Sequence, residues 1–240
     1  MRFLTHFLIE PSNTHNLRDF HLLLHGSDLL LLASGFIKMH QLFNTLPLTR
    51  LHFAGFGSVD CLPSSIALQS GACSSHTINL LDISSDYAFA PGIAETTMGI
   101  LKHSPIKSLF LCIVSLKPSH WTTLLGELNM TSLEKLVLEG DIPGPALIRF
   151  LTKHKGLKSI RIQCNVPLDR IRPSRQPFLP NLLTLCAPLG IHCDIGERLG
   201  NSTSLYNLEV EMSQFQPHDP TFLRLLQIVS HFQNLDHLGL

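Results

Sequence analysis

The stretch Leu133-Glu-Lys-Leu136-Val-Leu138 carries the pattern that decides the fold: an apolar residue, two others, an apolar residue, one other and an apolar residue. Successive side chains of a β-strand point to opposite faces, so residues two apart share a face. Leu136 and Leu138, at the fourth and sixth positions, therefore predict a short strand with one buried face. We call this pattern the phrase, number its positions from one, and continue the numbering past its end.

Eight further copies of the phrase lie on both sides of this one. They begin at Leu17, Leu48, Ile78, Ile106, Leu157, Leu182, Leu205 and Leu235. Successive copies start 23 to 31 residues apart. Such even spacing predicts a repeat fold, in which each unit is too small to bury its apolar face alone and stacks on its neighbours.

Between the phrases, most intervals carry apolar residues at the helical period. Three intervals show the spacing of one buried helix face, or a shorter version of it. These stripes are Trp121, Leu124, Leu125 and Leu128; Leu147, Ile148 and Leu151; and Phe222, Leu225, Leu226 and Val229. Asp219 and Pro220 favour the start of the last helix, as N-cap and first helical residue, and Ser27 predicts a further helix to about residue 43. Four prolines between 162 and 182 exclude a regular helix there, so we expect an extended loop.

An alternation of strand and helix predicts a curved stack. Strands stack about 4.8 Å apart, whereas helices pack about 8–10 Å apart. The mismatch bends such a stack, with the strands on the inner, concave side and the helices on the outer side. The predicted fold class is therefore α/β.

The phrase resembles the leucine-rich repeat, L-x-x-L-x-L followed by x-x-N/C-x-L, over nearly all of residues 17–240. The resemblance implies a right-handed α/β horseshoe of about nine irregular repeats, behind an N-terminal flank at 1–16. Only Asn165 matches the family's asparagine; Asp86, Asp141 and Ser213 are substitutes, so we expect irregular turns. Residues 178–188 look like repeats of fungal-type F-box proteins, which implies substrate recognition for ubiquitin ligation. No F-box precedes the repeats, so we expect no recruitment of the ligase core by this chain alone.

Composition and motifs exclude several classes of protein. The chain is 44% hydrophobic, and its 18 basic residues balance 18 acidic ones. This favours a folded core over disorder and argues against a nucleic-acid-coating protein. The longest apolar run, at 29–37, is short of the roughly 20 residues that a membrane span needs. We therefore expect no nucleic-acid partner and no membrane segment.

The sequence also lacks the motifs of catalytic and metal sites. It contains no G-x-S-x-G elbow and no P-loop, so we expect a protein that is not an enzyme. Six cysteines form no C-x-x-C pair, and fourteen histidines form no H-E-x-x-H, so we expect neither a metal nor another cofactor. Without a secretory signal, the cytoplasm or nucleus is the expected location.

The fifth position of each phrase lies between two buried positions, so it points to the open side of the strand. These side chains and their seventh-position neighbours are the candidate partner-binding residues: His21, His52, Asp82, Phe110, Cys112, Val137, Arg161, Glu209 and Glu211. Phe110, Cys112 and Val137 predict an exposed apolar patch, which favours the binding of a protein partner. The alternative is that Phe110 and Val137 have high strand propensity and only fill space.

A second candidate surface lies in the interval 149–175, where eight basic residues face one acid, Asp169. Leaving out Arg161, which is counted above, this basic patch comprises Arg149, Lys153, Lys155, Lys158, Arg170, Arg172 and Arg175. Arginine clusters bind phosphate through paired hydrogen bonds, so the patch predicts a phosphorylated or acidic ligand. The alternative is that these charges keep helix ends and a loop solvated.

Overall fold

The computed structural model describes residues 17–25, 46–56, 77–89, 94–163, 178–199, 204–211 and 220–239. The chain divides into two compact units, and each is described by itself. Unit 1 comprises Met1–Leu116 and Leu128–Ser132, and unit 2 comprises Lys117–Glu127 and Leu133–Leu240.

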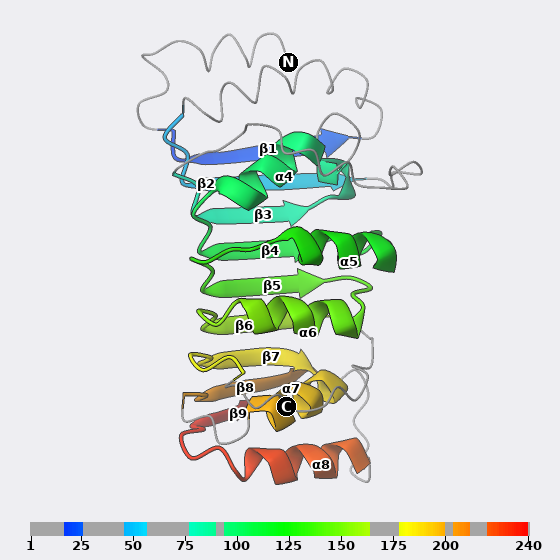
Figure 1. The fold of residues 1–240 in the computed structure, drawn as a ribbon, viewed down its shortest axis with the longest axis vertical. Coiled ribbons are helices and arrows are strands. Elements are labelled where there is room, and N and C mark those ends of the chain that lie inside the picture. The colour runs from blue at the N-terminus through cyan, green and yellow to red at the C-terminus, as the bar shows by residue number, and fades with distance from the viewer. Residues whose placement is uncertain are drawn as a thin grey trace. The chain divides into compact units, whose positions relative to one another are not determined.

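Both units are built from parallel strands that follow one another in chain order (Figure 1). Unit 1 contains β1 (Asp19–His25), β2 (Arg50–Phe56), β3 (Leu80–Ser84), the 3-10 turn η2 (Asp86–Phe89), α4 (Ala94–His103) and β4 (Ser108–Cys112). Unit 2 contains α5 (Pro118–Glu127), β5 (Lys135–Glu139), α6 (Gly144–Lys153), β6 (Ser159–Gln163), β7 (Thr184–Pro188), α7 (Leu189–Leu199), β8 (Asn207–Glu211), α8 (Pro220–Val229) and β9 (His237–Gly239). The predicted α/β class is confirmed.

All nine predicted strands form, one at each phrase, and within each unit they pair in the register of the phrase. The fourth positions pair with one another as Phe20, Leu51, Leu81 and Leu109 in unit 1. In unit 2 they pair as Leu136, Ile160, Leu185, Leu208 and Leu238. Register follows burial, because a slip by one residue would turn every buried side chain to the other face.

The phrase also organises the backbone just before each strand. The carbonyl oxygen of Arg18, at the second position, accepts hydrogen bonds from the amides of Thr49 and Arg50 at 2.8 and 3.0 Å. The equivalent carbonyl of Glu134 accepts from Lys158 and Ser159 at 2.8 and 3.0 Å. The same pair of bonds links the other described neighbours within each unit, so the turns before the strands superpose as a ladder.

The helical stripes predict α5 and α6 correctly. Trp121, Leu124 and Leu125 are buried in α5, and Leu147 and Leu151 are buried in α6. Both helices bury the face that the period indicates.

The buried face predicted for α8 is confirmed only in part. The helix begins at Pro220 as expected, but Leu225 is its one buried residue and Leu226 is 42% exposed. The reason is that α8 packs on α7, and no further described helix covers its other side.

Some expectations fall outside the described residues: the flank at 1–16, the helix from Ser27, the Asp219 cap and Asn165. The same holds for most of the loop between 162 and 182, of which only its ends are described. In the described part of the chain, no helix is both long enough and apolar enough to span a membrane.

Candidate partner-binding surface

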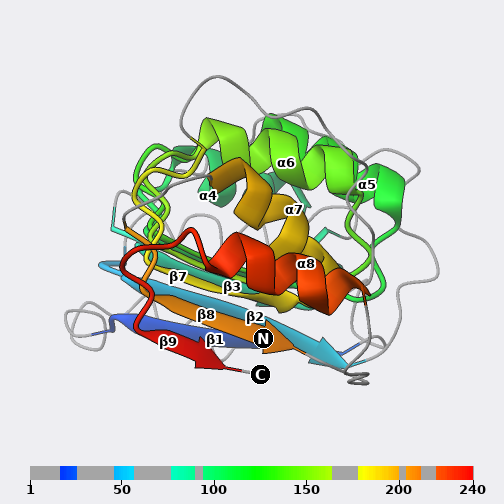
Figure 2. The same ribbon diagram turned by 90° about the horizontal axis from the view of Figure 1, so that it is seen from below.

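Within each unit the strands have one covered and one uncovered face. Figure 2 shows α4 on one side of the strands of unit 1, and α6, α7 and α8 on one side of those of unit 2. Fourth and sixth positions such as Leu81 and Ile83 point to this side and are 0% exposed. Third, fifth and seventh positions point the other way, and we call the surface that they form the open face.

The fifth positions of unit 1 form one row across the strands: His21, His52, Asp82 and Phe110. The imidazole rings of His21 and His52 stack with centroids 4.1 Å apart and planes 3° apart. Nδ1 of His52 lies 3.2 Å from Oδ2 of Asp82, a distance at which a proton on Nδ1 is donated to the carboxylate. The side chains of His52 and Asp82 are 24% and 31% exposed, so this linked row remains accessible.

Adjacent positions of unit 1 extend the row on both sides. Arg50 Nε lies 3.7 Å from Asp19 Oδ1 at the third position, and both side chains are exposed. Ser84, at the seventh position, donates its hydroxyl proton to the carbonyl oxygen of Phe53 at 3.3 Å. Cys112 follows on β4 and is half-buried.

The open face of unit 2 is organised around the carboxylate of Glu211. Its Oε1 accepts from Gln163 Nε2 at 3.0 Å and from Cys186 Sγ at 3.4 Å, and lies 3.4 Å from Arg161 Nε. These side chains come from three consecutive strands, β6, β7 and β8. Glu209 is exposed beside them and accepts from Asn207 Nδ2 at 3.3 Å.

The thiol of the Glu211 cluster is not activated as a nucleophile. Burial raises the pKa of the Cys186 thiol, so the sulfur is protonated at neutral pH and is a poor nucleophile. The hydrogen bond with Cys186, together with the charge of Glu211, raises the pKa of the Arg161 guanidinium. Arg161 is therefore a permanent cation.

The prediction of an exposed apolar patch was wrong for Val137. Phe110 and Cys112 are half-buried on β4 of unit 1, but Val137, on β5 of unit 2, is only 9% exposed. A short valine side chain beside the longer Arg161, its register partner on β6, presents little surface. Val137 thus fills space, as the alternative interpretation had it.

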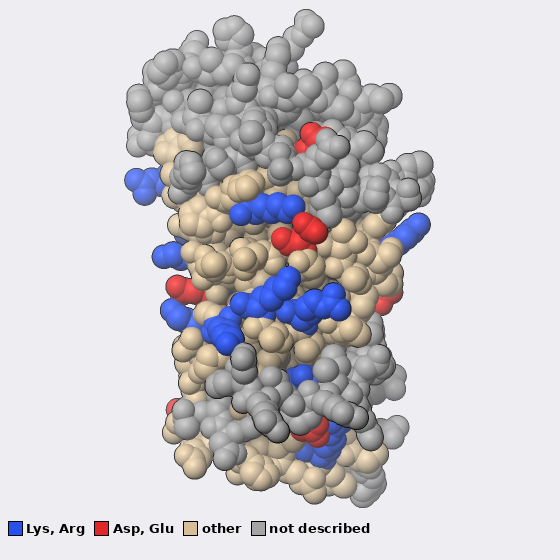
Figure 3. All heavy atoms as spheres, viewed as in Figure 1, with Lys and Arg blue, Asp and Glu red and all other residues tan. Residues whose placement is uncertain are grey.

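The basic patch is divided by the fold. Arg149, Lys153, Lys155 and Lys158 are exposed, and Figure 3 shows basic side chains gathered over α6. Lys158 Nζ pairs with Glu134 Oε2 at 2.9 Å, and Lys153 Nζ donates to the carbonyl oxygen of Gly126 at 2.9 Å. Arg161 lies on the open face instead. Arg170, Arg172 and Arg175 lie outside the described residues.

Sequence reasoning did not identify His192, which supports the open face from beneath. It is 0% exposed in α7, and its Nε2 lies 2.7 Å from the Glu209 carbonyl oxygen and 3.1 Å from the Ala187 amide nitrogen. Burial lowers its pKa to about 4, so the ring is neutral. The signal in the sequence is the helical spacing of His192 with Ile195 and Leu199, which places the ring on their buried face.

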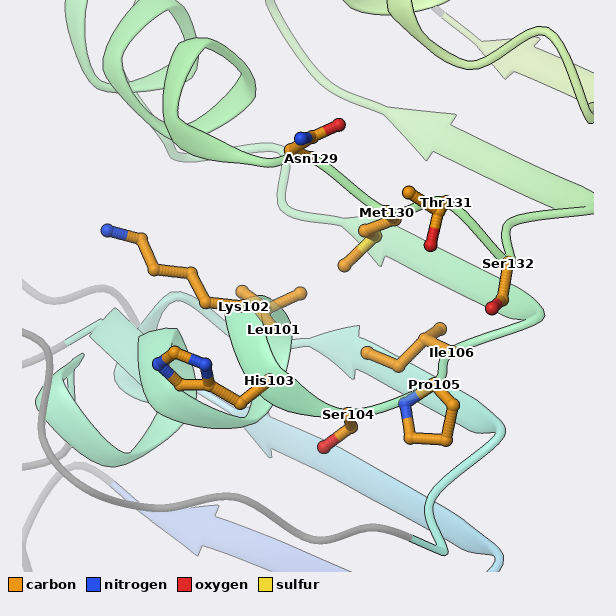
Figure 4. A pocket seen from close by; sticks show the side chains of 10 residues that line it. All are labelled: Leu101, Lys102, His103, Ser104, Pro105, Ile106, Asn129, Met130, Thr131 and Ser132. Carbon is orange, nitrogen blue, oxygen red and sulfur yellow. The ribbon is translucent and has the colours of Figure 1, made fainter.

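A hollow of about 290 Å³ lies away from the open face, at the C-terminal end of α4 in unit 1 (Figure 4). Leu101, Ile106 and Met130 line it with apolar side chains, and Lys102 and Asn129 stand at its edge. The hollow lies between the end of α4 and the turn at 129–132, and none of the candidate binding residues lines it.

The described residues contain neither a metal cluster nor a disulfide. Across the described ranges, no three His, Cys, Asp or Glu side chains gather as a metal site would require. Cys112, Cys186 and Cys193, the cysteines within those ranges, form no disulfide. No family model, curated protein or solved structure matches the chain.

Proposed function

We propose that this chain is a leucine-rich-repeat solenoid that binds a protein partner on the open face of its strands and catalyses no reaction. The observation that carries the proposal is a strand face whose side chains are ordered by one another and still accessible. His52 with Asp82, and Arg161 with Glu211, are examples. Such ordering before binding lowers the entropic cost of forming an interface.

The repeat architecture is supported by the turns as well as by the strands. Asp86 stands in the position of the family's asparagine, and its Oδ2 accepts the hydroxyl proton of Ser115, one repeat later, at 2.7 Å. A side chain at this position that bonds to the next turn performs the task of an asparagine ladder. Parallel strands in phrase register and helices on one side supply the other parts of such a repeat.

A protein is the partner that this face fits best. Its side chains stand about 4.8 Å apart from strand to strand and mix both signs of charge with the half-buried ring of Phe110. Interfaces between proteins combine apolar, aromatic and arginine side chains in this way. We place the module in a reducing compartment as part of the same proposal.

A matched pair of arginine variants tests the proposal. Arg161→Glu changes the open face, and Arg149→Glu makes the same change on α6, where the side chain is also exposed. Quantitative affinity purification of the full chain should lose its enriched partners with Arg161→Glu and keep them with Arg149→Glu. Retention of every partner by Arg161→Glu would contradict the proposal, provided that circular dichroism shows a folded protein.

The same pair tests the second hypothesis, a phosphorylated or acidic ligand on the basic patch. That hypothesis predicts the reverse result, with binding lost in Arg149→Glu. It has weaker support, because three of its arginines, Arg170, Arg172 and Arg175, lie outside the described residues. The F-box resemblance adds a narrower proposal, substrate recognition for ubiquitin ligation, which requires ligase core subunits among the partners that Arg161→Glu loses.

A further inference from the structure

The open face of unit 1 places one carboxylate between aromatic rings. Asp82 pairs in register with His52 on one side and with Phe110 on the other. Two strand spacings therefore separate the His52 and Phe110 positions, about 9.6 Å. A planar group needs about 7 Å between two rings that it contacts on both faces, so rings at positions two strand spacings apart can hold one between them.

The charge of this face is also specific. Among the described residues of unit 1, its acids are Asp19 and Asp82, and its permanent cation is Arg50, which lies beside Asp19 at 3.7 Å. Asp82 is bonded to His52 rather than to a permanent cation. The row His21, His52, Asp82 and Phe110 thus contains a carboxylate and no permanent cation.

We propose that the open face of unit 1 binds its protein partner through an arginine side chain, which pairs with the Asp82 carboxylate between the rings of His52 and Phe110. This inference rests on the proposed function and names the partner group that this part of the surface recognises. The Asp82 carboxylate and the flanking rings are complementary to a flat cation.

Arginine fits this position better than lysine. A guanidinium is planar, pairs with a carboxylate through two parallel N–H bonds and stacks on aromatic rings. An ammonium is a compact, strongly hydrated charge that gains less from rings on either side. The stacked partner His21 holds the His52 ring in place, so the position is ordered before the arginine arrives.

Nuclear magnetic resonance of the full chain at pH 7.5 tests the inference with three capped tripeptides, Gly-Arg-Gly, Gly-citrulline-Gly and Gly-Lys-Gly. Citrulline has the shape of arginine without its charge. We expect the arginine peptide to shift the resonances of His52 and Phe110 saturably. The citrulline and lysine peptides should bind about three- to fivefold more weakly.

Asp82→Asn should weaken binding of the arginine peptide by the same factor. Glu95→Gln, at an exposed carboxylate of α4 away from the open face, is the control and should leave that binding unchanged. Equal binding of the arginine and citrulline peptides would overturn the inference. So would stronger binding of the lysine peptide, or arginine binding that Asp82→Asn does not weaken.

The variants also separate this inference from the proposed function. If Asp82→Asn keeps the purified partners and Arg161→Glu loses them, the arginine inference fails and the binding face stands. If Arg161→Glu also keeps them, the proposed function itself fails.

Discussion

The open faces of the two units share a backbone pattern and differ in chemistry. In unit 1 the fifth positions are rings and one carboxylate, with His21 stacked on His52 and His52 bonded to Asp82. In unit 2 they include Arg161 and Cys186, which gather around Glu211. Both rows stand on fourth and sixth positions that are almost wholly leucine, isoleucine or valine. The buried positions are therefore similar in the two units, whereas the open positions give each unit a different surface chemistry.

The units also differ in how their helices are fastened. In unit 1 the Thr97 hydroxyl of α4 donates to the Ala88 carbonyl oxygen at 2.7 Å. In unit 2, α7 and α8 approach closely at Gly196, and Arg224 of α8 bonds to Glu197 of α7 at 2.7 Å. One unit thus relies on a buried hydrogen bond, and the other on close packing with an ion pair.

If the buried positions are interchangeable, the same truncation should cost the same in both units. Leu81→Ala and Leu136→Ala each remove a fully buried side chain, and each should lower the free energy of unfolding by about 2–5 kcal/mol. Urea denaturation measures the loss. Lys135→Ala, next to Leu136 but exposed, is the control and should change stability by less than about 0.5 kcal/mol. If only one of the two leucine variants loses stability, the buried positions of the two units are not equivalent.

We expect acid to destabilise unit 2, because His192 is buried there as a neutral ring. An unfolded histidine takes up a proton near pH 6.5, but His192 in the fold does so only near pH 4. Between these values the unfolded state binds more protons, so stability is complete above about pH 6.5 and falls as the pH drops to 4, by up to about 3 kcal/mol.

Urea denaturation across this pH range measures the acid response. His192→Gln keeps a hydrogen-bonding side chain that does not titrate, and it should flatten this part of the curve. An unchanged curve would show that other groups cause the acid response.

Much of the fold could be predicted because its signal is repeated. Nine phrases predict nine strands and their register, since one buried face permits no slip. In α7, Ile191, Ile195 and Leu199 keep the helical spacing. Its buried face also includes His192, Cys193 and Gly196, whose burial a hydrophobic period does not indicate. Whether a single polar or small residue is buried in a core depends on neighbours that are distant in the sequence.

The candidate site, like the fold, could be predicted from the sequence only in part. Alternation places the fifth positions on the open face, and that much follows from the sequence. The stacking of His21 on His52 and the gathering of three side chains on Glu211 depend on rotamers and on the order of neighbours across strands. The burial of Val137 likewise depends on the side chains beside it. Such pairings cannot be derived from spacing along one chain.

The close packing of unit 2 is tested at Gly196. A Cβ atom there would lie 2.7 Å from Ile228 Cγ2 of α8, so Gly196→Ala should destabilise the protein by about 1–3 kcal/mol. Gly190→Ala, in the same helix with no atom within 4 Å of its Cβ position, should be neutral or stabilising by up to about 1 kcal/mol. Thermal unfolding of both variants measures the difference. Equal effects would mean that α8 does not depend on this contact.

The buried hydrogen bond of unit 1 is tested at Thr97. Thr97→Val keeps the shape of the side chain and removes the donor to Ala88, which should cost about 1 kcal/mol. Thr97→Ser restores the hydroxyl and should recover the part of the loss that is due to the bond. Urea denaturation can resolve the two variants. If Thr97→Val is as stable as the native chain, this hydrogen bond does not contribute to the stability of unit 1.

The central claim, that partners bind on the strand side, is tested most directly by photocrosslinking. A photoreactive amino acid replaces Arg161 or Glu209 on the open face of unit 2, and Arg149 or Lys153 on α6, one position at a time. All four side chains are exposed, so the photoreactive group is accessible to solvent at each position. The account predicts crosslinks to a common partner from the two strand positions and none from the helix. Crosslinks to that partner from α6 alone would contradict it.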